Sequence, residues 1–237
     1  MKRLIVNADD FGLSAGINAG IVQAHEHGIV TSTSLMVRQT AAEEAAALAR
    51  RYPRLAVGLH IDLWESVFRD GQWRRLYSWT DDDPEAIERE VQAQLARFRD
   101  LTGRDPDHLD THQHVHRREP AASVVRRLAH TLDLPLRGDG TARYVGGFYG
   151  QDDTGGPYPE GITVVRLLDL LDALEHGLTE FGCHPGKVAE DDALGGTAYR
   201  IERNVECRTL CDPRVRARVA RGDIMLTSHG CLRRRHG

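Results

Sequence analysis

Two adjacent carboxylates closely follow the first apolar run of the chain. The run at residues 4–6 is Leu-Ile-Val, and Asp9 and Asp10 come shortly after it, ahead of Gly12, where the chain can turn. Neighbouring carboxylates repel each other unless a cation or a shared proton relieves the repulsion. The pair therefore predicts a bound metal ion, with further ligands supplied by other parts of the chain.

Histidines lie at the ends of three later segments that have the character of β-strands. His60 belongs to residues 56–63, in which apolar residues alternate with Gly, His and Asp, so that one face of this strand is polar. His112 ends residues 108–112, and His184 follows an apolar run within the motif Cys-His-Pro-Gly. Parallel α/β folds build their sites at the carboxyl ends of their strands, so we expect these histidines and the aspartate pair to meet.

These residue types suit metal-assisted hydrolysis. One carboxylate and two imidazoles make a three-point ligand set that leaves positions open for water and substrate. We expect Asp10, His60 and His112 to hold a divalent ion. Asp9 is then available as the general base for a metal-bound water, whose pKa the ion lowers. His184 could protonate the leaving group from the other side of the substrate.

Each of these residues also has a simpler explanation. A single Asp or His at the end of a strand is more often a capping or surface residue, and the aspartate pair could cap the following helix. The run that contains His112, His114 and His116 could be a solvated polar turn. Because all the clusters fall at the same predicted sheet edge, we favour a site. His229, at the end of the last predicted strand, is a weaker candidate for supporting the ligands.

The elements that must position these residues alternate between apolar runs and helical patterns, which is typical of βαβ units around a parallel sheet. The predicted helices span 14–28, 40–51, 83–103, 120–132, 162–176 and 212–221, and further strands lie at 31–37, 134–137 and 224–229. Ser14 is expected to cap the first helix, and Thr40 with Glu43 forms a capping box for the second. Seven or eight such units in 237 residues favour an irregular, TIM-like (β/α) barrel, as a single domain over 1–237. A doubly wound sheet is the alternative.

Two stretches, 65–82 and 138–161, interrupt this alternation. The first contains three aromatic residues without clear periodicity, and the second is rich in Gly and Pro. Long connections of this kind in a compact domain are usually functional, so we expect two loops that could wall a substrate site. Packing of these loops onto their own barrel is the other explanation.

Composition limits the partners. A net charge of -4 gives no electrostatic footprint for nucleic acid or an anionic membrane. No apolar run approaches the roughly 18 residues of a membrane span, and the run at 4–6 is too short for a signal peptide. The four cysteines are expected to be free thiols, which favours a cytoplasmic protein. The oligomeric state stays open, with a homodimer as one option.

Five motifs occur in order along the chain: NADDFGLS at 7–14, GIVTSTS at 28–34, GLH at 58–60, HLDTHQHVH at 108–116 and CHPG at 183–186. Together they resemble the motifs of the YdjC/ChbG-like carbohydrate deacetylases. The resemblance implies a (β/α) barrel, a divalent ion held by one Asp and two His, and hydrolysis of an N-acetyl group on an amino sugar, typically in chitooligosaccharides. Magnesium is the ion usually ascribed to this family, although two imidazoles suit zinc better. The substrate partner would be a small carbohydrate.

The resemblance assigns roles residue by residue. Asp10, His60 and His112 correspond to the ligands, Asp9 to the base, and His184 to the His of the Cys-His-Pro motif. The fourth motif departs from the family pattern at position 113, where Gln stands in place of a frequent third His and is not expected to touch the ion.

Two further residues and two further functions stay open. His114 and Arg137 are weaker candidates for contact with substrate; Arg137 could also help with the oxyanion, hold Asp9 or form a salt bridge elsewhere. The same ligands could serve a metal-dependent hydrolase of another bond, such as a phosphoester or another amide. A catalytically idle, sugar-binding barrel is the alternative outside the enzymes.

Overall fold

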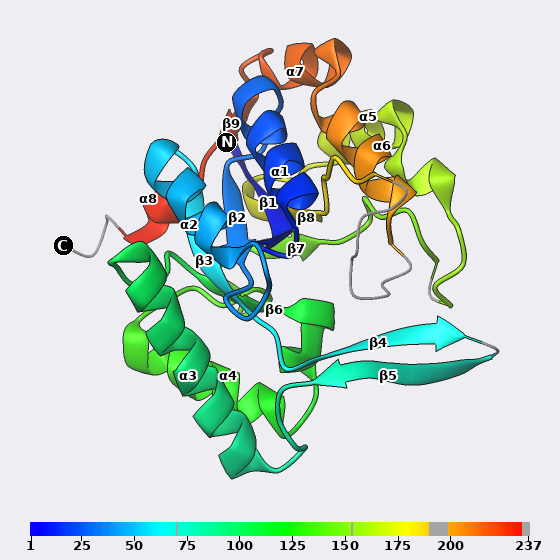
Figure 1. Cartoon of the computed structure of the whole chain (residues 1–237). Helices are drawn as coiled ribbons and strands as arrows, with labels where there is room; N and C mark the ends of the chain where they lie inside the picture. The colour runs from blue at the N-terminus through cyan, green and yellow to red at the C-terminus, as the bar shows by residue number, and fades with distance from the viewer. Residues whose placement is uncertain (70, 153, 190–198, 234–237) are drawn as a thin grey trace.

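A curled parallel sheet forms the centre of the protein. In a computed structural model that describes residues 1–69, 71–152, 154–189 and 199–233, six strands follow the order β6-β3-β2-β1-β8-β7, with β9 also paired to β1 (Figure 1). Their bounds are β1 Lys2–Phe11, β2 Ser32–Leu35, β3 Ala56–Ile61, β6 Leu109–Thr111, β7 Arg143–Val145, β8 Gly177–Cys183 and β9 Ile224–Leu226. All these pairings are parallel, and the sheet curls into an open half-barrel with helices outside it. The irregular (β/α) barrel predicted from the sequence is therefore confirmed.

The helices follow the strands in the βα order that the sequence predicts. They are α1 Ala15–His27, α2 Ala42–Arg51, α3 Pro84–Thr102, α4 Ala121–Leu132, α5 Val164–Asp172, α6 Ile201–Leu210, α7 Pro213–Val219 and α8 Gly230–Arg233, with 3-10 segments η1 His112–Arg117 and η2 Pro159–Ile162. Ser14 caps α1 by accepting from the Ile17 N–H at 3.2 Å, as expected. The prediction of a capping box at Thr40 is wrong, because α2 begins after Ala41, whose side chain makes no capping hydrogen bond.

Burial of the strands on both faces explains their apolar sequence. Leu4, Ile5 and Val6 at the start of β1 are at most 1% exposed. Part of the predicted polar face of β3 is explained by steric crowding at Gly58. A Cβ at this position would lie 2.5 Å from the His108 ring. The glycine thus lets a buried imidazole pass over the strand.

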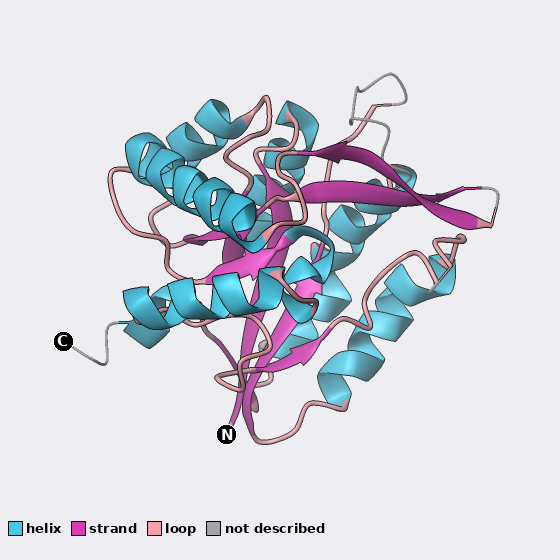
Figure 2. Ribbon diagram, turned by 90° about the horizontal axis from the view of Figure 1, so that it is seen from below, coloured by secondary structure: helices cyan, strands magenta, loops and turns pink. Residues whose placement is uncertain are grey.

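The stretch 65–82 is a β-hairpin, and its prediction as a long loop is wrong. Strands β4 Trp64–Arg69 and β5 Gln72–Ser78 pair antiparallel and extend beyond the helices (Figure 2). The sequence hides them because β5 is largely exposed, so it lacks an apolar alternation. The described part of the other stretch, 138–152 and 154–161, is irregular as expected apart from β7 and part of η2. The strand predicted at 134–137 is reduced to one bridge, between Leu109 and Leu136.

Helix α6 has no counterpart among the predicted elements. Its buried residues include Arg203, Glu206 and Thr209, so the face that packs inward is largely polar and the helix shows no apolar stripe. This helix is the principal omission of the sequence analysis, because it contributes to the site described below.

None of the helices in the described ranges is both long and apolar enough to cross a membrane. The structure places none of the four cysteines in a disulfide, in agreement with the expected thiols.

Candidate functional site

The end of β1 brings both adjacent aspartates to one place because the strand is bulged there. Consecutive side chains of a regular strand point to opposite faces of the sheet. The β1–β2 register shifts between Ala8 and Phe11, and Asp10 has a φ of 68°. A bulge with a left-handed residue redirects side chains, and Asp tolerates that conformation better than most residues. Asp9 and Asp10 are both buried at the carboxyl edge of the sheet.

Two of the three residues predicted as metal ligands, His60 and His112, converge on one oxygen atom of the third, Asp10. Asp10 Oδ1 lies 3.3 Å from His60 Nε2 and 3.2 Å from His112 Nδ1. One ligand atom from each of the three residues lies within 4.8 Å of the others. Among the described residues, Asp10 Oδ1 is buried and makes no hydrogen bond of normal geometry, so its charge must be met by a cation or by protonated His60 and His112. The donor set therefore fits a metal ion.

A second carboxylate fixes the orientation of His60. Its Nδ1 lies 2.8 Å from Asp110 Oδ1, which leaves Nε2 directed toward Asp10. Ser34 donates to the other Asp110 oxygen at 2.8 Å. A carboxylate behind the ring is the usual support for a metal-binding histidine, because it selects the tautomer and raises the basicity of the ligand nitrogen. Burial opposes protonation of His60, but Asp110 and Asp10 raise its pKa well above the ordinary value.

Asp9 is held by a buried guanidinium. Arg137 donates to both of its oxygens, at 2.6 and 2.7 Å, and Asn7 Nδ2 donates to Oδ1 at 2.8 Å. Burial favours the neutral acid, yet Arg137 outweighs it and keeps the pKa of Asp9 well below its usual range. Arg137 also binds Glu180 at 2.7 Å and Asp110 at 2.9 Å, with no exposed side-chain surface. Arg137 therefore holds Asp9, which is one of the roles expected for it, and its contact with substrate stays a prediction.

His184 lies between Asp9 and Glu206. Its Nε2 is 3.9 Å from Asp9 Oδ2, and its Nδ1 is 3.9 Å from Glu206 Oε1. The rings of Tyr149 and Tyr199 pack edge-on against it, at 5.1 and 5.7 Å between centroids. Burial lowers the pKa of His184 to about 4, so the imidazole is neutral at pH 7.

Two site residues that the sequence analysis missed come from α6. Arg203 donates to Asp10 Oδ2 at 2.7 Å, on the side away from the histidines. Glu206 accepts from the His184 backbone N–H and the Tyr199 hydroxyl, and burial raises its pKa to about 8. Their spacing of three residues places both on one helical face, and this is the signal that could have revealed them.

Comparison with known proteins agrees with this geometry. A model of the family described as YdjC-like protein matches residues 3–221. The chain is 36% identical to a carbohydrate deacetylase of Geobacillus stearothermophilus, over 95% of this chain and 96% of that protein. It is 35% identical to a chitooligosaccharide deacetylase of Serratia marcescens, over 96% and 98%. The chain belongs to the YdjC-like family.

A solved structure supports the same relationship. An Enterococcus faecalis protein, described as a cellobiose-phosphate cleavage protein, superposes on this YdjC-like chain with a TM-score of 0.78. The two are 27% identical, and the superposition covers 98% of each chain.

Gln113 and His114, which also belong to the HLDTHQHVH motif of this YdjC-like chain, contact different neighbours. Gln113 and His114 both have a positive φ, of 50° and 54°, so the segment after β6 turns sharply. The side chain of Gln113 bonds to the backbone of Ser66 on the hairpin. His114 Nε2 lies 3.3 Å from the Tyr144 hydroxyl, and burial lowers its pKa to about 3. Contact of His114 with substrate stays a prediction.

His108 and His229 form a separate pair beneath the site. Their rings stack at 3.8 Å between centroids, and His229 Nε2 lies 3.6 Å from Glu180 Oε2. Glu180 in turn binds Arg137. His229 therefore lies against Glu180, which binds the arginine that holds Asp9.

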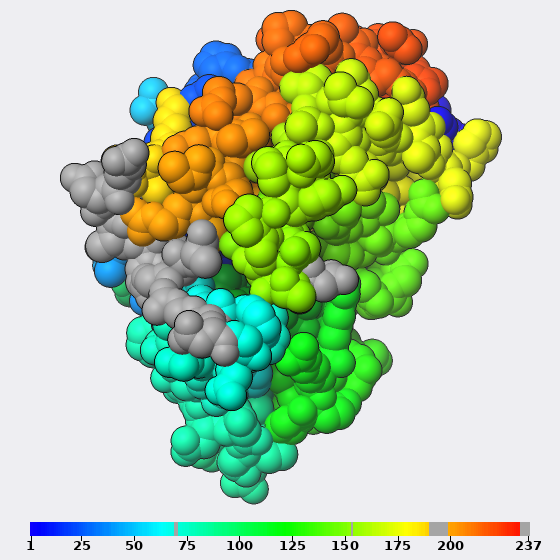
Figure 3. Space-filling model, turned by 90° about the vertical axis from the view of Figure 1, so that its right-hand side faces the viewer, coloured from blue at the N-terminus to red at the C-terminus, as the bar shows by residue number. Residues whose placement is uncertain are grey.

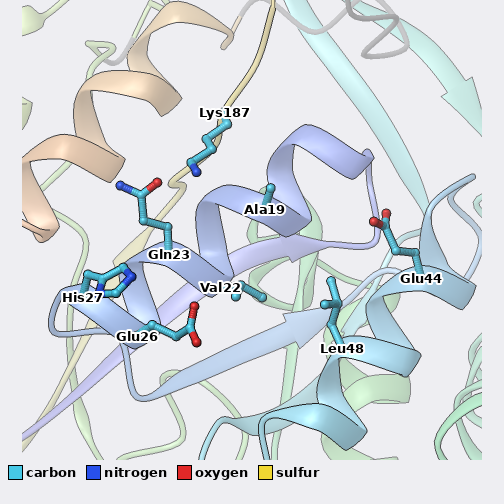
Figure 4. A pocket seen from close by; sticks show the side chains of 8 residues that line it. All are labelled: Ala19, Val22, Gln23, Glu26, His27, Glu44, Leu48 and Lys187. Carbon is cyan, nitrogen blue, oxygen red and sulfur yellow. The ribbon is translucent and has the colours of Figure 1, made fainter.

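A cavity of about 340 Å³ lies elsewhere, on the outer side of α1 (Figure 4). Its lining residues are Ala19, Val22, Gln23, Glu26, His27, Glu44, Leu48 and Lys187. None of them belongs to the cluster at the sheet edge. We therefore assign the chemistry of this YdjC-like protein to the cluster and not to the cavity.

Proposed function

We propose that the protein is a metal-dependent carbohydrate N-deacetylase, which hydrolyses the acetamide of an N-acetylated amino sugar or chitooligosaccharide. The names of its YdjC-like relatives support this substrate class. The observation that carries the proposal is the convergence of His60 and His112 on a buried Asp10 oxygen without a hydrogen bond, beside a second carboxylate that is held in place.

Asp10, His60 and His112 are the proposed ligands of a divalent ion. When bound, the ion supplies a Lewis acid that lowers the pKa of a coordinated water and polarises the acetyl carbonyl. Arg203 and Asp110 orient Asp10 and His60 from behind. The family resemblance implies magnesium, whereas one carboxylate and two imidazoles suit zinc, cobalt or nickel. A panel of ions is therefore part of the test.

Asp9 is the proposed general base. Arg137 keeps it ionised and leaves Oδ2 on the side that faces His184. A carboxylate with so low a pKa is a weak base, so the attacking water must itself be acidified for the proton to move. His184 Nε2, at 3.9 Å, is the next acceptor for this proton, and we propose that His184 then delivers it to the leaving amine.

The single-domain organisation over 1–237 stays part of the proposal. It is supported by the origin of the site residues, since Asp9 and Asp10 come from the first strand and Arg203 and Glu206 from a helix near the other end. A cytoplasmic location is retained on the sequence argument alone.

An acetate-release assay tests the function directly. Oligomers of N-acetylglucosamine are incubated with the protein and each of several divalent ions, and released acetate is measured. We expect Asp9→Asn to keep the ion but lose about 10²–10⁴-fold in rate, the usual contribution of a general base. His60→Ala should lose the ion as well, as measured by equilibrium dialysis.

The exposed Asp100→Asn on α3 is the matched control and should behave as wild type. Full acetate release by Asp9→Asn would contradict the role of Asp9 as base. Tight binding of the sugar without acetate release at any ion loading would favour the idle sugar-binding barrel. Release of phosphate from a sugar phosphate, without acetate release, would favour the other hydrolase.

A further inference from the structure

The β4–β5 hairpin begins at the candidate metal site. Glu65, near the start of β4, places Oε2 3.9 Å from His112 Nε2. The next residue, Ser66, makes two hydrogen bonds with the side chain of Gln113: its N–H donates at 3.0 Å and its carbonyl accepts at 2.7 Å. Because Gln113 directly follows His112, these bonds join the base of the hairpin to the segment that contains His112.

A second segment, which contains Tyr149 and Gly155, contacts both His184 and the same hairpin. Tyr149 packs against the His184 ring at 5.1 Å and stacks on Tyr199 at 4.5 Å. Six residues later, a Cβ placed on Gly155 would lie 3.4 Å from the Phe68 Cβ. Figure 3 shows the cyan hairpin abutting the yellow-green segment that contains residues 150–160. One segment is bonded to the residue that follows His112, the other packs against His184, and the two meet at Phe68.

Phe68 and Trp73 form an exposed aromatic pair at this meeting point. They are cross-strand partners on β4 and β5, with ring centroids 5.5 Å apart. Phe68 is 36% exposed and Trp73 is 61% exposed, although such large apolar rings are normally buried. Exposed aromatic surface beside a site commonly marks a binding surface. Two uncharged rings suit a ligand with an apolar face, such as the C–H face of a sugar ring.

We propose that Phe68 and Trp73 are a stacking platform for a second sugar ring, next to the ring whose acetamide is cleaved. Phe68 lies two residues beyond Ser66, or about 7 Å along the strand, so the platform is one short step from the residues around the ion. The substrate is therefore an oligosaccharide and not a single amino sugar. This inference rests on the proposed function, and it gives the hairpin a role that the motifs do not assign.

Chain-length preference is the test. Acetate release is measured on N-acetylglucosamine and on its tetramer, for wild type, Trp73→Thr and Phe68→Leu. Thr retains the strand preference at position 73 but removes the ring. We expect the ratio of kcat/KM on the tetramer to kcat/KM on the monosaccharide to fall about tenfold, through a higher KM for the tetramer. Trp73→Phe should restore most of this ratio.

Val165→Ala on α5 is the control, since Val165 is also apolar and 64% exposed, and the ratio should not change. Binding is measured separately by quenching of tryptophan fluorescence with the tetramer in the Asp9→Asn background. Quenching that disappears in Trp73→Thr supports the platform even if the wild type releases no acetate, in which case only the proposed function fails.

Three results would overturn the platform. An unchanged ratio in both variants is the first, and unchanged quenching in Trp73→Thr is the second. The third is an equal loss of activity on both substrates together with a smaller sedimentation coefficient, because this would assign the aromatic pair to contact with a second copy of the chain.

Discussion

The two adjacent aspartates face two differently built halves of the site. On the Asp10 side, one oxygen is bound by Arg203 and the other faces His60 and His112 without making a hydrogen bond. On the Asp9 side, both oxygens accept from Arg137. A carboxylate oxygen left open between imidazoles marks a ligand position, whereas a carboxylate held at both oxygens is oriented for another task.

The two halves also differ in charge. Arg203 contacts one buried carboxylate, Asp10, whereas Arg137 contacts three: Asp9, Asp110 and Glu180. Asp9, Asp110 and Glu180 thus share one guanidinium and depend on it together. Asp10 has Arg203 at one oxygen only, so its other oxygen, between His60 and His112, is where an ion can add to stability.

Replacing the two arginines in turn gives the largest expected effect. Arg137→Met leaves three buried carboxylates without their shared guanidinium, so we expect the free energy of unfolding to fall by about 3–5 kcal/mol. Arg203→Met should cost less, because a bound ion still compensates Asp10. Urea denaturation with and without a divalent ion measures both. The exposed Arg126→Met on α4 is the control, and equal losses in the two buried variants would contradict the comparison.

The sequence predicts that the proposed ligand residues lie together, but not how neighbouring residues hold them. His60 and His112 could be placed with the aspartates because parallel strands end at one edge. The bulge at Asp10 could not be foreseen, since a regular strand would send the two aspartates to opposite faces. Arg203 escaped because the inward face of α6 is polar and shows no apolar stripe. The hairpin escaped because its second strand is exposed.

Removal of the ion is expected to give the next largest effect, and it distinguishes the role of Asp10 from that of Asp9. A ligand present at a hundred times its Kd stabilises a protein by about 2.7 kcal/mol, and a chelator removes this contribution. We expect a chelator to lower the Tm of wild type and of Asp9→Asn. The Tm of Asp10→Asn and of His112→Ala should stay the same with and without the chelator. Thermal unfolding followed by circular dichroism measures the shifts. A chelator effect that persists in Asp10→Asn would place the ion elsewhere.

The smallest effect concerns Glu206, which supports His184 on the Asp9 side. Burial raises the pKa of Glu206 to about 8, so the folded protein keeps a proton that the unfolded chain has already lost. For a raised pKa, the stabilising contribution is fully present below the unfolded value of 4.5 and is lost as pH rises through about 8. Glu206→Gln mimics the protonated acid and removes this dependence. Between pH 7 and pH 8, the stability of wild type should therefore fall relative to that of Glu206→Gln by about 1 kcal/mol.

This pH window isolates Glu206 from His184. Burial lowers the pKa of His184 to about 4, so its contribution is present above 6.5 and is lost as pH falls toward 4, outside the window. Urea denaturation at the two pH values gives the difference, with the exposed Glu85→Gln on α3 as the control. If Glu206→Gln and wild type change in parallel, Glu206 is already ionised at pH 7. His184 would then have an ionised carboxylate near each ring nitrogen, Asp9 at one and Glu206 at the other. The Asp9 side would then carry one more buried negative charge than the raised pKa of Glu206 allows.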